Sequence, residues 1–439
     1  MSDVDNRPTW LVAVDDDPTG CQSVSGVPLL TAWDHETLTA AAHRNAPVTF
    51  VLTNSRSLSE DEAVRANTDV GAALASVAAA TGLQLRLISR SDSTLRGHFP
   101  AEAHALAAAA GIDADGIVIC PAFFEAGRFT ADGIHWVHHH GELVPACDTE
   151  FANDATFGFS ELTLADWSRT RGAPDDVIDI GLTELTNNDT DSIAAKLTSA
   201  ADGQAIVVNA TNYHHLDTFD AAARAAEAAG SRFIYRTGPS FVRAAARAPA
   251  PALADLASAN QPRSHGLVVV GSHTDTTNDQ VAVAVQNHPL ELIELDASAV
   301  LDPRHAARHI ARTAESAANA LTRSPVLVRT SRNVIMHDDT RTPLEISRVV
   351  ADALTETVRQ TASATQPAWV IAKGGITSHE LLTKAFRVRT AEVTGQALPG
   401  IIPVLDIAIG NQTLPYVIFP GNVGDQYPLS HVLDRLTTP

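Results

Sequence analysis

Three consecutive aspartates, Asp15, Asp16 and Asp17, follow the apolar run Trp10–Val14 near the start of the chain. A turn over Asp17–Gly20 would explain one aspartate, because that residue is common in turns, but it would not explain three. If the apolar run is a strand, the triplet stands at its carboxyl end, where parallel α/β sheets bind their ligands. Carboxylates in that position can hold Mg²⁺ through water, accept a proton from a hydroxyl or hydrogen-bond a polyol.

A second polar segment, Ser89–Pro100, also follows an apolar run. Arginine forks bind carboxylates through two parallel hydrogen bonds, and neighbouring hydroxyl groups complete an anion pocket. The structural alternative is an Asp–Arg ion pair beside a capped helix. We interpret the segment as an anion site formed by Arg90, Asp92, Ser93, Thr94 and Arg96.

The segment Pro121–Gly133 is a weaker candidate of the same kind. Glu125 and Arg128 could face a ligand, although the two phenylalanines beside them could equally pack between domains. Arg56, which follows another apolar run, could reach the site but is not included among the expected site residues. The triplet His138–His140 has no second cluster of metal ligands at a defined spacing, so we expect a solvated loop there.

Three patterns of the capping-box type predict where helices begin. They start at Ser59, Thr277 and Thr377, each followed three residues later by Glu or Gln. The Walker motif, the dinucleotide-binding GxGxxG motif and the GxSxG elbow of hydrolases do not occur in the chain. Their absence excludes a Walker-type nucleotide enzyme and disfavours a standard dinucleotide fold.

The second half of the chain contains three glycine segments, each after an apolar run. Glycines before a helix let backbone N–H groups approach an anion, and the helix dipole favours phosphate there. A plain glycine turn would explain any one of them, but three in one domain predict a nucleotide site. The segments are Gly271-Ser272, Lys373–Thr377 and Gly421-Asn422.

Together these segments resemble the four-carbon acid sugar kinase family. The motifs occur in the family's order over nearly the whole chain, with two departures: Pro18 stands where leucine is commoner and Ile376 where glutamate is common. The D-D-x-T-G motif corresponds to Asp16–Gly20, D-S-T-L-R-G to Asp92–Gly97, P-A-F-x-E-x-G-R to Pro121–Arg128, the glycine-serine turn to Gly271-Ser272, G-G-x-T-S to Gly374–Ser378 and G-N-x-G to Gly421–Gly424.

The resemblance implies ATP-dependent phosphorylation of the terminal hydroxyl of a four-carbon sugar acid of tetronate or 3-oxo-tetronate type, with ATP and Mg²⁺ as cofactors. Such a transfer depends on alignment and charge neutralisation. It implies Asp17 as the base or hydroxyl-orienting group, with Asp16 and Asp92 assisting, whereas Asp15 lies outside the motif. The implied substrate-binding residues are Arg90, Ser93, Thr94, Arg96, Glu125 and Arg128, and the implied ATP-binding residues are Ser272, Lys373, Gly374, Gly375, Ile376, Thr377, Gly421 and Asn422.

Two alternatives remain open on the sequence. The first is a haloacid-dehalogenase-like phosphatase, in which Asp15 is the nucleophile and Asp17 the acid/base; the expected lysine and late acidic pair are not found at suitable positions. The second is a non-catalytic sugar-acid binding protein.

The elements that must position these residues follow a βαβ rhythm. Short β-branched runs alternate with alanine-rich helical stretches, which is typical of a largely parallel sheet with helices on both faces. We expect two α/β domains with an active site in the cleft between them: residues 1–245 for the sugar acid, a linker over 246–264, and residues 265–439 for the nucleotide. The expected strands are 10–14, 48–53, 83–89, 116–120, 205–210 and 232–237, then 266–272, 290–296, 325–331, 368–375, 401–409 and 416–422.

Composition narrows the class of protein. The chain has 439 residues and a net charge of −20, which disfavours a nucleic-acid partner but allows a local arginine cluster to bind an anionic small molecule. Three unevenly spaced cysteines indicate a reducing compartment. We find neither a signal peptide nor an apolar run of about 18 residues, so we expect a cytoplasmic protein, with a homodimer as one possible assembly.

Overall fold

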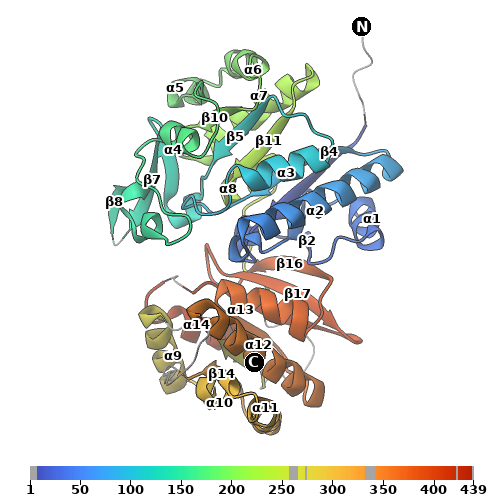
Figure 1. The fold of residues 1–439 in the computed structure, drawn as a ribbon, viewed down its shortest axis with the longest axis vertical. Coiled ribbons are helices and arrows are strands. Elements are labelled where there is room, and N and C mark those ends of the chain that lie inside the picture. Colours follow the sequence, from blue (N-terminus) through green and yellow to red (C-terminus); the bar gives the residue numbers. More distant parts are fainter. Residues whose placement is uncertain are drawn as a thin grey trace. The chain divides into compact units, whose positions relative to one another are not determined.

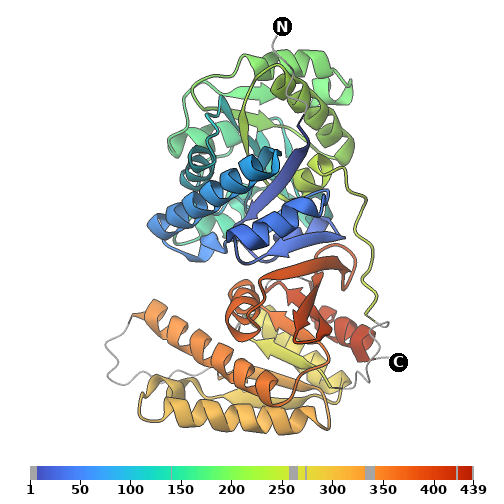
Figure 2. The same cartoon turned by 90° about the vertical axis from the view of Figure 1, so that its right-hand side faces the viewer.

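The structure is a computed structural model, and it describes residues 7–139, 141–256, 265–271, 274–331, 342–421 and 424–437. The chain forms two compact units, Met1–Pro251 and Ala252–Pro439. The division falls inside the segment 246–264 that we expected to be a linker. Each unit is an α/β domain with helices packed on a sheet (Figures 1 and 2). No described helix is long and apolar enough to cross a membrane.

The N-terminal unit is organised around β1 (Thr9–Asp15), a strand buried along all but its first residue. Such a continuous buried run is typical of a strand inside a parallel sheet covered on both faces. The strand order is β2-β3-β1-β4-β11-β5-β10-β9, and every pairing in it is parallel. The other strands are β2 (Val27–Leu30), β3 (Thr49–Leu52), β4 (Gln84–Arg90), β5 (Gly116–Cys120), β9 (Ile178–Ile180), β10 (Gln204–Val208) and β11 (Phe233–Thr237).

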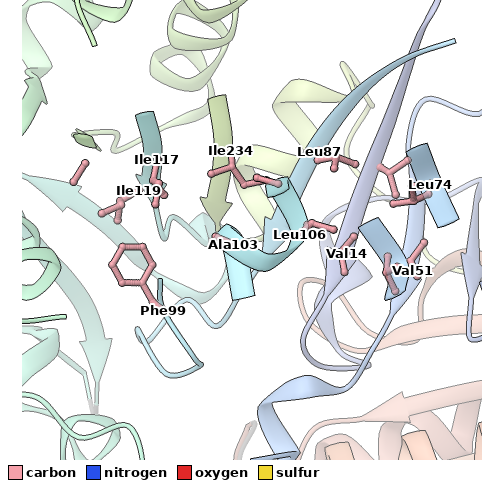
Figure 3. Packing of buried hydrophobic residues seen from close by; sticks show 14 of the residues in the cluster. Val14, Val51, Leu74, Leu87, Phe99, Ala103, Leu106, Ile117, Ile119 and Ile234 are labelled. Carbon is pink, nitrogen blue, oxygen red and sulfur yellow. The ribbon is translucent and has the colours of Figure 1, made fainter. Parts of the chain in front are cut away.

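Helices α1 (His35–His43), α2 (Glu60–Thr81) and α3 (Ala101–Ala109) bury their apolar sides in one core with the sheet. Figure 3 shows Leu74 of α2 and Leu106 of α3 beside strand residues such as Val14. The two helices lie very close, because a Cβ added at Gly71 would stand 2.6 Å from the carbonyl oxygen of Leu106. This packing holds the carboxyl ends of β1 and β4 in place. The remaining helices are α4 (Leu164–Thr170), α5 (Leu182–Thr186), α6 (Thr190–Thr198), α7 (Tyr213–Ala228) and α8 (Pro239–Ala245).

A small antiparallel sheet interrupts the βαβ rhythm after β5. Its order is β6-β7-β8, and short 3₁₀ helices follow it, among them η5 (Glu150–Asn153). The sequence did not predict this sheet. Its strands are β6 (Arg128–Ala131), β7 (Ile134–His139) and β8 (Glu142–Pro145).

The C-terminal unit has a mixed sheet of order β13-β14-β12-β15-β18-β17-β16. The pairings from β13 to β18 are parallel, and those of β17 with β18 and with β16 are antiparallel. The strands are β12 (Leu267–Val270), β13 (Glu291–Leu295), β14 (Val326–Thr330), β15 (Val370–Lys373), β16 (Thr390–Gln396), β17 (Pro403–Ile409) and β18 (Gln412–Phe419), and the helices are α9 (Asp275–Asn287), α10 (Ala297–Leu301), α11 (Ala306–Leu321), α12 (Pro343–Ala364), α13 (Gly375–Glu380) and α14 (Pro428–Thr437).

One of the three predicted helix starts is confirmed and two are wrong. Ser59 caps α2 in a full capping box. Helix α9 begins one turn before the prediction, because Thr274 accepts the hydrogen bond from the Thr277 backbone N–H and so takes the capping role. Helix α13 begins at Gly375, so Thr377 lies inside it. In both cases an earlier residue, Thr274 or Gly374, adopts the non-helical backbone conformation that marks the start of the helix.

Candidate active site and nucleotide site

The aspartate triplet lies where we expected it, at the carboxyl end of β1. The backbone of Asp16 donates to the Arg90 carbonyl at 3.2 Å, and Thr53 donates to the Asp15 carbonyl at 3.0 Å. These bonds extend the ladder of β1 toward β4 on one side and β3 on the other. The triplet is thereby clamped between the segments that follow both neighbouring strands.

Asp15 points into the protein. Its side chain is fully buried, and Oδ1 accepts hydrogen bonds from Arg90 Nη1 at 2.9 Å and from the Asp17 backbone at 3.2 Å. Burial raises the pKa of Asp15 to about 7, against the opposing attraction of Arg90. A Cβ at Gly20 would collide with this carboxylate, so the following turn packs directly on it. Asp15 therefore fixes the positions of Arg90 and of the turn that carries Asp17.

Asp16 lies beside Arg90, with 3.4 Å between Oδ1 and Nη1. Its Oδ2 atom is buried and has no hydrogen-bond partner among the described residues. The backbone of Gly97 passes close by, since a Cβ there would stand 3.3 Å from Oδ2. Burial raises the pKa of Asp16 to about 6, although Arg56 and Arg90 act in the opposite direction. A carboxyl group of this kind can exchange a proton near neutral pH.

Asp17 is the most exposed of the three, at 13%. Its Oδ1 accepts from the Thr19 backbone at 2.8 Å, and its Oδ2 forms an ion pair with Arg56. Burial alone would raise the pKa of Asp17, but Arg56 and Thr19 outweigh it, and the pKa lies below its usual value. Asp17 is thus held ionised at the mouth of the cluster.

The loop after β4 brings its polar residues onto the triplet. Asp92 accepts from Arg96 Nε at 2.7 Å and from Thr94 Oγ1, and Arg56 Nη1 lies 3.2 Å from its other oxygen. Burial opposes ionisation, but Arg96 and Arg56 hold the pKa of Asp92 well below its usual range. Asp92 therefore serves as a fixed anion that orients two arginines. Leu95 adopts φ of 71°, a left-handed conformation uncommon for leucine.

Strand β6 delivers Arg128 to the same place. Its Nη1 donates to Ser93 Oγ at 2.7 Å, while its buried Nε has no partner among the described residues. His135 of β7 supports the loop through a 2.8 Å hydrogen bond between its Nε2 and the Ser93 carbonyl. Burial lowers the pKa of His135 to about 4, so the ring is neutral at pH 7 and Nε2–H donates.

Glu125 lies in a different set of contacts. Its carboxylate accepts from the Tyr213 hydroxyl at 2.6 Å and from Arg243 Nη1 at 3.2 Å, and Ser240 lies 3.4 Å away. These partners come from α7 and α8, and within the described part of the chain Glu125 makes no hydrogen bond to the triplet or to the loop after β4. The structure brings the other expected residues of the N-terminal unit together and leaves Glu125 apart.

Two residues of the cluster were not among those expected. Arg56 bridges Asp17 and Asp92, although the sequence offered only its place after a strand. Arg236 of β11 lies beneath the loop, where its Nη2 donates to the Arg96 carbonyl at 3.2 Å and its guanidinium stands 5.1 Å from the Trp167 ring. Burial lowers the pKa of Arg236 to about 10. Nothing in the run of residues around Arg236 signals this position.

The glycine segments of the C-terminal unit follow β12, β15 and β18, which are adjacent in its sheet. Adjacent parallel strands bring their carboxyl ends to one edge, so the segments are neighbours. A Cβ at Gly271 would collide with Thr377, and Thr277 Oγ1 lies 3.3 Å from the Gly421 carbonyl. Gly374 has φ of 111°, which favours glycine. The expected residues Ser272 and Asn422 lie outside the described residues.

Lys373 is the last residue of β15 and the first residue of the second glycine segment. Its side chain is fully buried, its ammonium group donates to the Pro420 carbonyl at 3.3 Å, and it stands 4.3 Å from the centre of the Phe419 ring. Burial lowers the pKa of Lys373 to about 7. Lys373 thus ties the end of β15 to the end of β18. Ile376, in contrast, is 57% exposed on the second segment.

Comparisons with known proteins place the chain in a family. A family model described as a sugar-binding N-terminal domain matches residues 11–245, and one described as a nucleotide-binding C-terminal domain matches residues 267–429. The chain belongs to the four-carbon acid sugar kinase family. The aspartate–arginine cluster of this family member therefore lies in its sugar-binding domain, and the three glycine segments lie in its nucleotide-binding domain.

Solved structures share the fold of this family member. A Salmonella typhimurium LT2 protein, solved under the provisional description of a tRNA synthase, is 17% identical with a TM-score of 0.70, over 97% of this chain and 98% of that one. Protein HI1011 of Haemophilus influenzae is 16% identical with a TM-score of 0.63, over 97% and 100%. At these identities the likeness concerns the fold alone. No curated protein matched the chain.

Proposed function

We propose that the protein is an ATP-dependent kinase that phosphorylates the terminal hydroxyl of a four-carbon sugar acid of tetronate or 3-oxo-tetronate type. The observation that carries the proposal is the buried cluster of aspartates and arginines in a sugar-binding domain, on a chain that also has a nucleotide-binding domain. Buried Oδ2 of Asp16 and Nε of Arg128 have no partners among the described residues, and polar groups in that state favour a polar ligand.

The two kinds of charge suit the two ends of such a substrate. Arg96 and Arg128 offer planar donor groups for the carboxylate. Asp17, ionised and partly exposed, orients the hydroxyl, and Asp16 hydrogen-bonds the polyol. Because phosphoryl transfer passes through a loose transition state, alignment of the hydroxyl matters more than a strong base. The lowered pKa of Asp17 is compatible with that role.

In this proposal the nucleotide binds at the glycine segments of the C-terminal unit. Gly374 and Gly375 let backbone N–H groups approach phosphate, and exposed Ile376 is available to the nucleotide. ATP supplies the transferred phosphoryl group. The described residues contain no cluster of three or more His, Cys, Asp or Glu side chains arranged for a metal ion. We propose that Mg²⁺ arrives on the ATP phosphates, its usual ligands together with water.

Burial of Asp15 argues against the phosphatase alternative. That mechanism needs Asp15 as a nucleophile facing the phosphate ester, but its side chain is 0% exposed and bound to Arg90. The non-catalytic alternative does not account for a nucleotide-binding domain. We further propose a cytoplasmic protein.

A coupled ADP-release screen over sugar acids of four to six carbons tests the function. We expect ATP-dependent turnover with a four-carbon acid and none with a panel of phosphate esters in the absence of ATP. Hydrolysis of the esters would support the phosphatase, and acid binding without any turnover would support the binding protein.

A further inference from the structure

One aromatic ring lies against both arginines assigned to the substrate carboxylate. The guanidinium carbon of Arg96 stands 5.2 Å from the centre of the Phe151 ring, and that of Arg128 stands 5.4 Å from it. The three residues come from different segments: the loop after β4, strand β6 and the short helix η5. Their meeting point is therefore a product of the tertiary fold.

Phe151 is not a core residue. Its ring is only partly buried, and within the described part of the chain it does not belong to the hydrophobic cluster of the N-terminal unit. The residue before it, Glu150, pairs with His139 of β7 at 2.7 Å, and the His139 ring lies 6.2 Å from that of Phe151. These contacts hold the ring against the arginines.

The two arginines differ in their other partners. Arg96 is bound to Asp92, whereas the Nη1 of Arg128 donates to a neutral hydroxyl, that of Ser93. The two guanidinium charges repel each other, and the bonds to Asp92 and Ser93 fix Arg96 through Nε and Arg128 through Nη1. An aromatic face attracts guanidinium groups through its quadrupole and restricts their planes, so one ring can hold both forks near each other.

We propose that Phe151 is the positioning residue that sets Arg96 and Arg128 into a paired clamp for the carboxylate of the acid, an inference that rests on the kinase function proposed above. The ring does not touch the transferred phosphoryl group in this proposal. Its loss should weaken acid binding and leave nucleotide binding intact.

The test compares Phe151→Leu, which keeps an apolar side chain but removes the ring, with Phe151→Tyr, which keeps the ring. Phe159→Leu is the matched control. The guanidinium carbon of Arg171 stands 5.9 Å from the centre of the Phe159 ring, and neither residue of this pair is an expected site residue. For Phe151→Leu we expect KM for the acid to rise about five- to thirtyfold. KM for ATP and kcat should stay within about twofold of wild type, because in this proposal the ring does not touch the transferred phosphoryl group.

Rescue separates positioning from a general loss of structure. Phe151→Tyr should have an acid KM close to that of wild type. Phe159→Leu should also leave the acid KM unchanged, even if both leucine variants lower Tm. Three results with an active wild type would overturn this inference alone. They are an unchanged acid KM in Phe151→Leu, an equal rise of the acid KM in Phe159→Leu, and an acid KM in Phe151→Tyr as high as in Phe151→Leu. A wild type that turns over no sugar acid would overturn the proposed function and the inference with it.

Discussion

Replacing Arg56 by glutamine should unbalance the whole cluster. Arg56 is 17% exposed and faces two carboxylates, Asp17 at 13% and Asp92 at 9% exposure. Removing one partner of a buried ion pair typically costs about 3–5 kcal/mol, because the remaining charge stays uncompensated. Since these side chains retain some exposure, we expect a loss near the lower end, about 3 kcal/mol in the free energy of unfolding at pH 7.

The effect should depend on pH in a defined direction. The pKa values of Asp17 and Asp92 lie below their usual value in the folded protein. Their contribution to stability is therefore present above the unfolded pKa of about 4 and is lost as the pH falls through the folded values. Arg56→Gln removes part of this contribution, so the difference in unfolding free energy between wild type and variant should stay nearly constant from pH 7 to about pH 4 and narrow below about pH 4.

Urea unfolding of the full chain at pH 7 and at pH values below about 4 measures this difference. Trp10, Trp33, Trp136 and Trp167 report on the N-terminal unit, and calorimetry separates its transition from that of the other unit. Arg56→Lys keeps the charge and should lose less. The matched control is Arg169→Gln, which breaks an exposed pair and should cost less than about 1 kcal/mol. Equal, pH-independent losses for Arg56→Gln and Arg169→Gln would refute the reasoning.

Three further predictions concern catalysis. Asp17→Asn should lower kcat by about 10²–10⁴, and Asp15→Asn should lower it far less; an inactive Asp15→Asn beside a merely impaired Asp17→Asn would instead indicate a phosphatase. Arg96→Lys keeps the charge but loses the fork, so KM for the acid should rise while KM for ATP stays constant, and an unaltered acid KM would remove Arg96 from the clamp. Gly374→Ala strains a backbone with φ of 111° and should raise KM for ATP alone; an unchanged ATP KM would separate Gly374 from the nucleotide.

Most of the fold was predictable because its strands are short apolar runs between turn residues. The twelve expected strands are present with ends shifted by a few residues, and β5 matches at both ends. The strands that were missed give weaker patterns. Strand β2 is four residues long with a proline inside it, and β16 (TAEVTGQ) contains a glycine beside a bulge in its antiparallel pairing. The β6–β8 sheet lies in a polar stretch where histidines and glycines hide the alternation.

The sequence by itself determined which residue types stand at the strand ends. A parallel sheet brings those ends to one edge, so a run of aspartates after β1 and an arginine-rich loop after β4 had to become neighbours. Residue spacing could not predict that Arg56 bridges two aspartates or that Glu125 lies apart from the cluster. It also could not predict that Arg236 donates to the loop after β4. Each depends on contacts between segments that only the packed fold brings together.

Only the tertiary structure decided how the three aspartates differ in orientation and in pKa. Strand β1 ends at Asp15, and the turn that follows it fixes each carboxylate separately. Asp15 turns inward onto Arg90 and becomes hard to ionise, whereas Asp17 turns outward onto Arg56 and stays charged. Arg90 reaches the triplet from the end of β4, and Arg56 reaches it from the short 3₁₀ helix Ser55–Ser57 after β3. Identical side chains in one run therefore acquire different chemistry, because desolvation and charge pairing are set by residues distant in the sequence.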